Sequence, residues 1–308
     1  MSLWASLKPS ERNGFGYGST AEDVTDDLEL GGKTILVTGC NSGLGMESMR
    51  VLARRGAHVI GTARTLEKAS AACAAVQGKT TPLSCELAEP ASVRGCVQRL
   101  RDEGVQLDAL IANAGIMALP ELETVLGYEK QFFTNHIGHF ALITGLLDSL
   151  NEQARIVILS SDAHRRAPPE GIQFDNLDGA RGYIPWAAYG QSKLANLLFA
   201  KELARRLRNT QITVNACHPG VINTNLSRHM NPVLRFILGA IAGPLLLKSV
   251  AQGAATQCYL AVHPQVEGVT GTYFADCNET ACRSDGTDMA LAKKLWERSE
   301  AIVARLHA

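Results

Sequence analysis

The chain has 308 residues, of which 46% are hydrophobic and 19% are charged, a composition that suits one large globular domain or at most two. Thirty basic residues balance thirty acidic ones, so the charge predicts binding neither to nucleic acid nor to an anionic membrane surface. The eight cysteines form no Cys-x-x-Cys pair, which argues against a zinc site and suits reduced thiols in a reducing compartment. We therefore expect no metal site.

The sequence shows neither a targeting nor a membrane-spanning pattern. The first residues, Met-Ser-Leu-Trp-Ala-Ser, lack the basic-then-apolar order of a signal peptide. The longest apolar run covers the 12 residues 236–247 and contains two glycines and a proline, so it is too short and too broken to cross a bilayer. These observations predict a soluble, cytoplasmic protein.

Residues 1–30 differ in composition from the rest of the chain. A glycine-rich stretch at 13–20 is followed by five acidic residues between positions 22 and 29. We interpret 1–30 as an N-terminal extension and 31–308 as one domain. The extension is expected to be an extended arm, either packed on the surface of the core or, as the favoured alternative, a solvated leader.

From residue 33 onward, short runs rich in β-branched residues alternate with helical patterns. Strands separated by helices of ten or more residues indicate a parallel sheet covered on both faces. The sequence thus predicts an α/β domain with about seven strands. The predicted strands are 34–38, 57–62, 80–85, 107–112, 155–160, 212–217 and 271–275, and the predicted helices are 46–55, 65–76, 90–103, 127–150, 188–208, 251–262 and 288–306.

Three glycines, Gly39, Gly43 and Gly45, lie between the first predicted strand and the first predicted helix. The first allows a tight turn, the second lets backbone approach a pyrophosphate, and the third lets helix and strand pack closely. The helix N-terminus supplies free N–H donors for phosphates. In this context the loop predicts dinucleotide binding, and the absence of a Lys-Ser/Thr pair disfavours a P-loop.

The second predicted strand ends in Arg64, and no acidic residue lies between positions 57 and 65. In dinucleotide-binding folds an acidic residue here binds the 2′-hydroxyl of NAD, whereas a basic residue accommodates the 2′-phosphate of NADP. Arg64 therefore predicts NADP(H).

Tyr189 and Lys193 are four residues apart on a predicted helix, so their side chains share one face. An ammonium beside a phenol favours the phenolate and is expected to lower the tyrosine pKa from its usual value of about 10. Such a tyrosine can exchange a proton near neutral pH. Tyr183 has no lysine four residues on.

These motifs resemble those of the short-chain dehydrogenase/reductase family, in the family's order and from about residue 32 to the C-terminus. Within the family the chain is most similar to the retinol dehydrogenase and WW-domain oxidoreductase group, although Glu86 stands where the family usually has Asp. The resemblance rests on Thr38-Gly-Cys-Asn-Ser-Gly-Leu-Gly45, Ala112-Asn-Ala-Gly115, Asn135-His-Ile-Gly-His-Phe140, Ile158-Leu-Ser-Ser161, Tyr189-x-x-x-Lys193 and His218-Pro-Gly-Val-Ile-Asn-Thr224.

The resemblance implies a single-domain Rossmann fold and a catalytic tetrad of Asn135, Ser161, Tyr189 and Lys193. Tyr189 would act as general acid in carbonyl reduction and as base in alcohol oxidation. Ser161 would donate to the substrate oxygen, Lys193 would tune Tyr189 and hold the ribose, and Asn135 would position a water in a proton relay. Strand alternation places Ser160 and Ser161 on opposite faces, and the family pattern favours Ser161.

The cofactor site implied in this way covers several strand ends. Its expected residues are Gly39, Asn41, Ser42, Gly43, Leu44, Gly45, Arg64, Glu86, Leu87, Asn113, Ala114, Gly115, Tyr189, Lys193, Pro219, Gly220, Ile222 and Thr224.

Two apolar stretches, 162–188 and 225–250, are expected to form the substrate pocket. They favour an NADP(H)-dependent reductase of a hydrophobic ketone or aldehyde, or oxidation of the corresponding alcohol. An NAD-dependent alcohol dehydrogenase and a non-catalytic dinucleotide-binding scaffold or sensor stay open as alternatives. The predicted helices 127–150 and 188–208 correspond to the family's usual dimer surface, so a homodimer or homotetramer is also an open expectation. His164 is interpreted as a surface group or a support behind the site.

Overall fold

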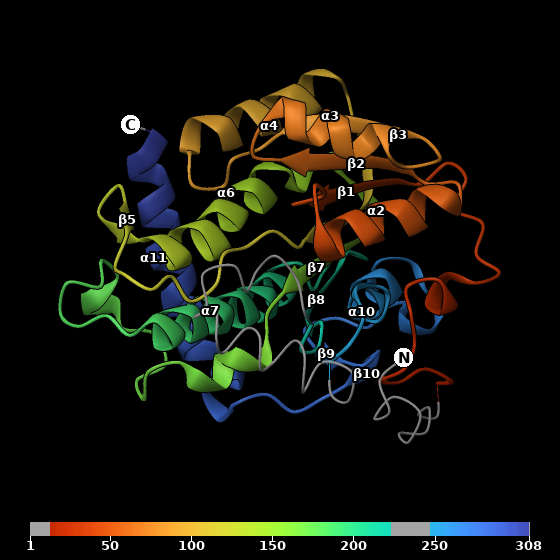
Figure 1. The fold of residues 1–308 in the computed structure, drawn as a ribbon. Coiled ribbons are helices and arrows are strands. Elements are labelled where there is room, and N and C mark those ends of the chain that lie inside the picture. The colour runs from red at the N-terminus through yellow and green to blue at the C-terminus, as the bar shows by residue number, and fades with distance from the viewer. Residues whose placement is uncertain (1–12, 223–246, 308) are drawn as a thin grey trace.

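The computed structural model describes residues 13–222 and 247–307, which form an α/β structure around one large sheet (Figure 1). In the described residues this sheet has eight strands in the order β10-β9-β8-β7-β4-β1-β2-β3. The seven predicted strands are present and run parallel, and a short edge strand, β10, pairs antiparallel with β9. The strands are β1 Thr34–Thr38, β2 His58–Ala63, β3 Thr80–Ser84, β4 Leu107–Ala112, β7 Leu150–Leu159, β8 Thr213–His218, β9 Tyr273–Ala275 and β10 Asn278–Glu279.

Helices cover both faces of the sheet, as the sequence predicts. In Figure 1, α6 and α7 lie on one side of the sheet while α2 and α10 lie on the other. The helices are α2 Gly43–Arg54, α3 Leu66–Ala74, α4 Pro90–Asp102, α5 Lys130–Phe132, α6 Gly138–Gly145, α7 Pro185–Arg206, α10 Val250–Val262 and α11 Met289–His307.

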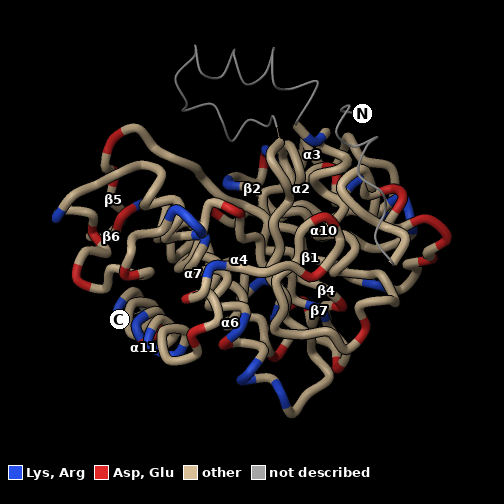
Figure 2. The backbone as a smooth tube through the Cα atoms, turned by 90° about the horizontal axis from the view of Figure 1, so that it is seen from below, with Lys and Arg blue, Asp and Glu red and all other residues tan. Residues whose placement is uncertain are grey.

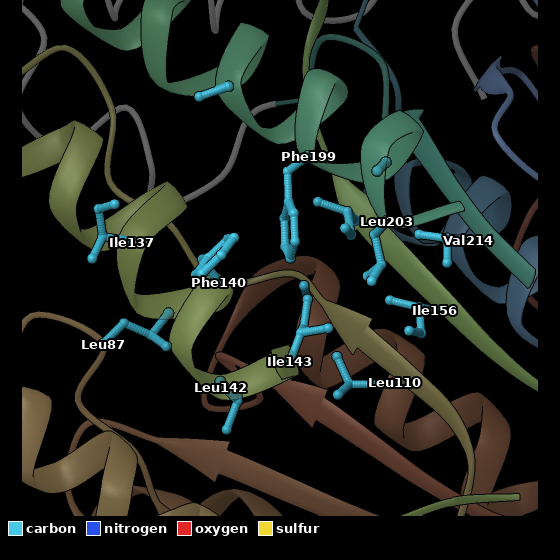
Figure 3. Close-up of a cluster of buried hydrophobic side chains, with 14 of the residues drawn as sticks. Leu87, Leu110, Ile137, Phe140, Leu142, Ile143, Ile156, Phe199, Leu203 and Val214 are labelled. Atoms are coloured by element: carbon cyan, nitrogen blue, oxygen red, sulfur yellow. The ribbon is translucent and has the colours of Figure 1, made fainter. Parts of the chain in front are cut away.

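The strand residues alternate between two hydrophobic cores, one on each face of the sheet. Leu110 of β4 belongs to the core under α4, α6 and α7, whereas its neighbour Ile111 belongs to the core under α2 and α10. This alternation follows from the two-residue period of a strand. Figure 3 shows the first core, where Phe140 of α6 and Phe199 of α7 lie 5.1 Å apart between their ring centroids.

The C-terminal helix α11 packs against α6 and α7 and contributes Trp296 to this first core. Trp296 makes an edge contact with Phe140 at 4.9 Å and is covered by the guanidinium of Arg206 at 4.0 Å. Ser299 is fully buried and its hydroxyl lies 2.8 Å from Nε2 of His136. Helix α11 therefore forms a third layer on this side.

The predicted helix at 127–150 is the largest difference from the sequence analysis. The structure divides it into β6 (Tyr128–Glu129), α5, a π-helical turn at Phe133–Ile137, α6 and a 3₁₀ turn, Leu147–Ser149. The strand β7 then begins at Leu150, five residues earlier than predicted. A second small sheet pairs β6 with β5 (Thr124–Val125).

Residues 13–30 pack on the domain, so the interpretation of a solvated leader is wrong for the part that the structure describes. Val24 is fully buried in the core under α2 and α10. The Phe15 ring contacts Tyr259 of α10 at 5.5 Å, and the side-chain amide of Asn13 donates to the carbonyl of Cys277 at 2.8 Å. Residues 13–30 therefore form part of the folded domain.

Acidic and basic residues alternate around the described part of the chain when it is viewed from below (Figure 2). Within residues 13–222 and 247–307, the helices are either too short or too polar to cross a membrane.

Candidate functional site

A cavity of about 960 Å³ opens at the carboxyl ends of the parallel strands. In sheets of this kind ligands bind at this edge, where the strand order reverses beside β1 and β4. Most of the predicted site residues line it, namely Gly39, Asn41, Ser42, Gly43, Leu44, Arg64, Glu86, Leu87, Asn113, Ala114, Gly115, Ser161, Tyr189, Lys193, Pro219, Gly220 and Ile222. Thr224 and the predicted pocket residues 225–246 lie outside the described residues.

The glycine loop has the geometry that phosphate binding needs. Gly39 and Gly43 adopt positive φ angles of 70° and 57°, which glycine reaches without a steric penalty. A Cβ on Gly45 would collide with the carbonyl oxygen of Gly39, so this glycine allows the close contact of helix with loop. Ser42 precedes α2 without capping it through its side chain, and it lines the cavity. The loop and the α2 N-terminus therefore fit a dinucleotide pyrophosphate.

Buried polar groups behind the loop hold the ends of β1 and β4 together. The Thr38 hydroxyl accepts from the backbone N–H groups of Asn113 and Ala114, both at 2.9 Å. The Asn113 side-chain amide donates to the Thr38 carbonyl at 2.8 Å. His139 lies 2.9 Å from the Thr38 hydroxyl and from the Asn135 carbonyl, and burial lowers its pKa to about 4. Neutral His139 thus links the glycine loop to the π-helical turn.

At the far end of the cavity, Arg64 and Glu86 follow β2 and β3. The Nε atom of Arg64 lies 4.0 Å from Oε2 of Glu86, and the Arg64 side chain is 56% exposed. Glu86 also accepts from the backbone N–H of Ala88 at 3.2 Å. A guanidinium at this place can bind a phosphate through charge-assisted hydrogen bonds.

Asn135 stands behind the cavity wall. Its side chain accepts from the backbone N–H of Ile116 and donates to the Ile116 carbonyl and to Ser192, all at 2.9 Å. A Cβ on Gly115 would lie 3.1 Å from Asn135 Oδ1, a tight contact that glycine avoids. The amide therefore braces the loop after β4 against α7.

Tyr189, Lys193 and Ser161 come together at the end of β7. Tyr189 and Ser161 share a hydrogen bond, and the Lys193 ammonium lies 5.8 Å from the centre of the Tyr189 ring. Lys193 donates to the Leu159 carbonyl at 3.1 Å. Both side chains are almost completely buried yet reach the cavity.

The pKa of Tyr189 differs from the sequence-based expectation, which is wrong in direction. Burial raises the Tyr189 pKa to about 12, and the hydrogen bond from Ser161 offsets only part of this rise. Burial also lowers the pKa of Lys193 to about 8. Tyr189 is therefore a neutral phenol at pH 7, a state that can donate a proton.

The two neighbouring serines have different environments. The Ser160 hydroxyl is buried and donates to the Lys193 carbonyl at 2.7 Å. Its proton is therefore engaged within the protein and is not free to bind a substrate. The Ser161 hydroxyl accepts from the N–H of Ala163 at 3.2 Å. His164 is fully buried: its Nδ1 lies 2.6 Å from the Ser161 carbonyl, and its Nε2 accepts from the N–H of Arg283. The surface interpretation of His164 is wrong, since this histidine supports the Ser161 turn.

The turn after β8 packs against Lys248, a residue that the sequence analysis did not predict for the site. Gly220 has a φ of 90°, and a Cβ on it would lie 2.6 Å from the Lys248 side chain. Lys248 is buried and its ammonium lies 2.6 Å from Asp276 Oδ1. This ion pair holds the Pro219-Gly220 turn against the β9–β10 hairpin. Lys248 and Asp276 are 28 positions apart in the sequence, so no local pattern could have predicted that they pair.

Comparison with known proteins identifies the family of the chain. The family model described as short chain dehydrogenase matches residues 33–234. The chain is 42% identical to short-chain dehydrogenase TIC 32 B, chloroplastic, from Brassica napus, over 96% of both chains. It is 40% identical to human retinol dehydrogenase 14, over 89% of this chain and 87% of that protein.

Solved structures show the same fold. A crystal structure of an uncharacterised protein from Mycobacterium Paratuberculosis covers 91% of this chain and 97% of its own, at 32% identity and a TM-score of 0.74. A short chain dehydrogenase from Burkholderia cenocepacia, in complex with NADP, covers 80% of this chain and 96% of its own, at 25% identity and a TM-score of 0.63. The chain therefore belongs to the short-chain dehydrogenase/reductase family of oxidoreductases and is similar to its retinol dehydrogenase group.

Proposed function

We propose that this chain is an NADP(H)-dependent oxidoreductase that reduces a hydrophobic ketone or aldehyde, or oxidises the corresponding alcohol. The observation that carries the proposal is the convergence of Ser161, Tyr189 and Lys193 with the glycine loop on one cavity. The names of the retinol dehydrogenase relatives and the NADP complex of a structural neighbour support the substrate class and the cofactor.

In carbonyl reduction the residues of this chain provide positioning and a proton. NADPH, when bound, supplies the hydride that reaches the carbonyl carbon. The Ser161 hydroxyl donates a hydrogen bond to the carbonyl oxygen, where negative charge develops. The Tyr189 phenol, neutral because burial raises its pKa to about 12, gives its proton to that oxygen. Oxidation runs the same transfers in reverse.

Lys193 and Asn135 support these steps. The Lys193 ammonium, held by the Leu159 carbonyl, stabilises the phenolate that Tyr189 becomes and offers N–H groups to the ribose hydroxyls. The proton lost by Tyr189 is replaced through a water positioned by Asn135, which lies next to Gly115 and near Lys193.

The preference for NADP(H) over NAD(H) rests on Arg64. Its guanidinium lines the adenosine end of the cavity, where it would bind the 2′-phosphate. The further cofactor contacts would come from the glycine loop, the turns after β3 and β4, and the turn at Pro219 and Gly220. The single domain over 31–308, the cytoplasmic location and the absence of a nucleic-acid partner stay predictions.

A panel of carbonyl compounds and alcohols, followed by NADPH absorbance, tests the proposal. We expect turnover that falls by about 10²-fold or more in Tyr189→Phe, because the proton donor is lost. The matched control is Tyr183→Phe, which changes a tyrosine outside the cavity lining. Turnover that is equal in wild type and Tyr189→Phe would rule out the mechanism. Dinucleotide binding without turnover of any compound would favour the scaffold alternative, and a lower KM for NADH than for NADPH would favour the NAD alternative.

A further inference from the structure

The side chains of Arg166, Trp186 and Tyr189 contact one another in that order between the protein surface and the proposed proton donor. Arg166 ends the short 3₁₀ helix Asp162–Arg166 that follows Ser161. Its guanidinium carbon lies 4.9 Å from the centre of the Trp186 ring. Trp186 in turn makes an edge contact with the Tyr189 ring, with 6.1 Å between centroids. All three side chains line the cavity, so one indole separates the cation from the proposed catalytic phenol.

The positive charge of Arg166 has no carboxylate partner in the described part of the chain. Asp162 and Glu170, each four residues away in the sequence, form no ion pair with Arg166, and Asp162 is bound by Arg165 at 2.8 Å. Every ion pair within residues 13–222 and 247–307 involves other cations. Residues 223–246, which follow the turn after β8, contain no Asp or Glu in the sequence. Among the described residues, therefore, no carboxylate neutralises the cation at the substrate side of the cavity.

The environment of Arg166 suits one ligand chemistry. A guanidinium stacked on an aromatic ring keeps its N–H edge free, and that edge matches a carboxylate through two parallel hydrogen bonds. The indole also shields one face of the cation from water, which strengthens such a pair relative to a fully exposed one. Met117 and Val125 add apolar surface to the cavity lining, which also contains the polar residues Asp162, Lys130 and Thr134.

The position of Arg166 relative to Tyr189 is held by close backbone packing. A Cβ on Gly190, the residue after Tyr189, would lie 2.7 Å from both the Ala163 carbonyl oxygen and the Ala167 backbone nitrogen. The Ala167 N–H also donates to the His164 carbonyl. The turn that carries Arg166 is thus pressed against the first turns of α7.

We propose that Arg166, stacked on Trp186, binds a carboxylate of the substrate, and that the preferred substrates are apolar or aromatic aldehydes and ketones bearing a carboxylate at the end away from the carbonyl. The inference rests on the proposed reductase function and adds the substrate class. Arg166 acts as a specificity residue at a distance from the reacting atoms, where it binds the anionic end while Ser161 and Tyr189 bind the carbonyl oxygen.

A matched pair of substrates separates charge recognition from catalysis. With NADPH present, kcat/KM is measured for 4-formylbenzoate and for its neutral methyl ester, which share the reacting aldehyde. We expect the acid-to-ester ratio of kcat/KM to fall by about tenfold in Arg166→Gln, since one charge-assisted pair on a partly exposed site is lost. Arg166→Lys should keep part of the ratio, because it retains the charge without the planar edge.

Arg165→Gln is the control variant. Arg165 is the adjacent arginine, but it binds Asp162 and the Ala281 carbonyl and does not line the cavity. Its removal should leave the acid-to-ester ratio unchanged. An equal fall in Arg165→Gln and Arg166→Gln would overturn the proposal, because it would indicate a long-range effect of net charge.

A binding measurement distinguishes failure of this subsite from failure of the reductase function. With NADP⁺ in place of NADPH, the Kd of 4-formylbenzoate is measured by calorimetry at low and high salt. A Kd that rises about tenfold in Arg166→Gln supports the subsite even if neither aldehyde is reduced, an outcome that would count against the reductase function alone. If both aldehydes are reduced but the ratio and the Kd are the same in Arg166→Gln as in wild type, or if no binding depends on Arg166, the subsite is wrong.

Discussion

The Nε atom of Arg64 lies 4.0 Å from the Oε2 atom of Glu86, so the cation at the adenosine end of the cavity faces a carboxylate. Both side chains line the same cavity, and Glu86 follows β3 while Arg64 follows β2. A 2′-phosphate placed on Arg64 would also be close to this negative charge. The strength of the proposed preference for NADP(H) should therefore depend on both Arg64 and Glu86.

Opposite effects are expected from the two members of this pair. Arg64→Ala should raise the KM for NADPH by about tenfold with little change for NADH, because a charge-assisted contact on a largely exposed side chain is lost. Glu86→Gln should lower the KM for NADPH, since it removes repulsion of the phosphate and frees the guanidinium. Initial rates with both cofactors provide the test, and equal losses for NADPH and NADH in Arg64→Ala would contradict the assignment.

The rate of carbonyl reduction is expected to decline above about pH 8, and Lys193 is the cause. Burial raises the pKa of Tyr189 to about 12, so the proton donor stays protonated throughout the usual assay range. Burial lowers the pKa of Lys193 to about 8, so its charge is lost above that pH. In Lys193→Arg the charge persists, because guanidinium titrates above pH 12, and the alkaline decline should disappear from the remaining activity. A decline at the same pH in Lys193→Arg would contradict this explanation.

Buried His136 is expected to make the protein sensitive to acid. Burial lowers its pKa from 6.5 to about 3. Between these two pH values the histidine therefore binds a proton in the unfolded state but not in the folded state. The free energy of unfolding therefore falls as the pH drops from 6.5 towards 3. At pH 4.5 this histidine alone accounts for about 2 to 3 kcal/mol, from two pKa units.

The variant His136→Gln, which can still hydrogen bond to Ser299, should narrow the difference in unfolding free energy between pH 7 and pH 4.5. Urea unfolding at the two pH values measures this difference. His58→Gln is the control, because the His58 imidazole is only half-buried and should have a smaller effect. An unchanged difference in His136→Gln would show that other groups dominate acid unfolding.

Gly190 is expected to be essential for both stability and turnover. An added Cβ would meet backbone atoms of residues 163 and 167, which cannot move aside as a flexible side chain would. Gly190→Ala should cost about 1 to 3 kcal/mol and lower kcat, since Ser161 and Tyr189 lie on the two segments pushed apart. Thermal unfolding and initial rates measure the two effects.

Gly95, within α4, is the matched control for Gly190. A Cβ at Gly95 would meet nothing within 4 Å. Gly95→Ala should therefore stabilise the protein by about 0.5 to 1 kcal/mol, through helix propensity alone. Similar effects of the two glycine variants would argue against the packing role of Gly190.

Local patterns were sufficient to predict the sheet and the glycine loop. Strand β1, Thr34–Thr38, has the predicted bounds, because its β-branched run stands between polar residues and a glycine. The glycines Gly39, Gly43 and Gly45 could be assigned to a dinucleotide-binding loop because a predicted strand precedes them and a predicted helix follows them.

Features that arise from tertiary contacts could not be predicted. The segment 127–150 is apolar on most sides, so its helical period gave no sign of the π-helical turn, where Asn135 bonds to Ile116 and Ser192. The pKa of Tyr189 depends on burial, which its own helix does not encode. Arg166 and Trp186 are 20 positions apart in the sequence, and the close packing at Gly190 is one of the tertiary contacts that hold their segments together.

Helix α11 has a consequence for how the enzyme behaves in solution. Trp296 packs on Phe140 of α6 and Ser299 on His136 of the π-helical turn, within the surface where the family resemblance leads us to expect subunit pairing. With that surface taken by its own C-terminus, each chain should work independently. Activity per mole of enzyme should therefore stay constant on dilution, and plots of rate against substrate concentration should be hyperbolic. Mixing in chains inactivated by Tyr189→Phe should not change the activity of the active chains.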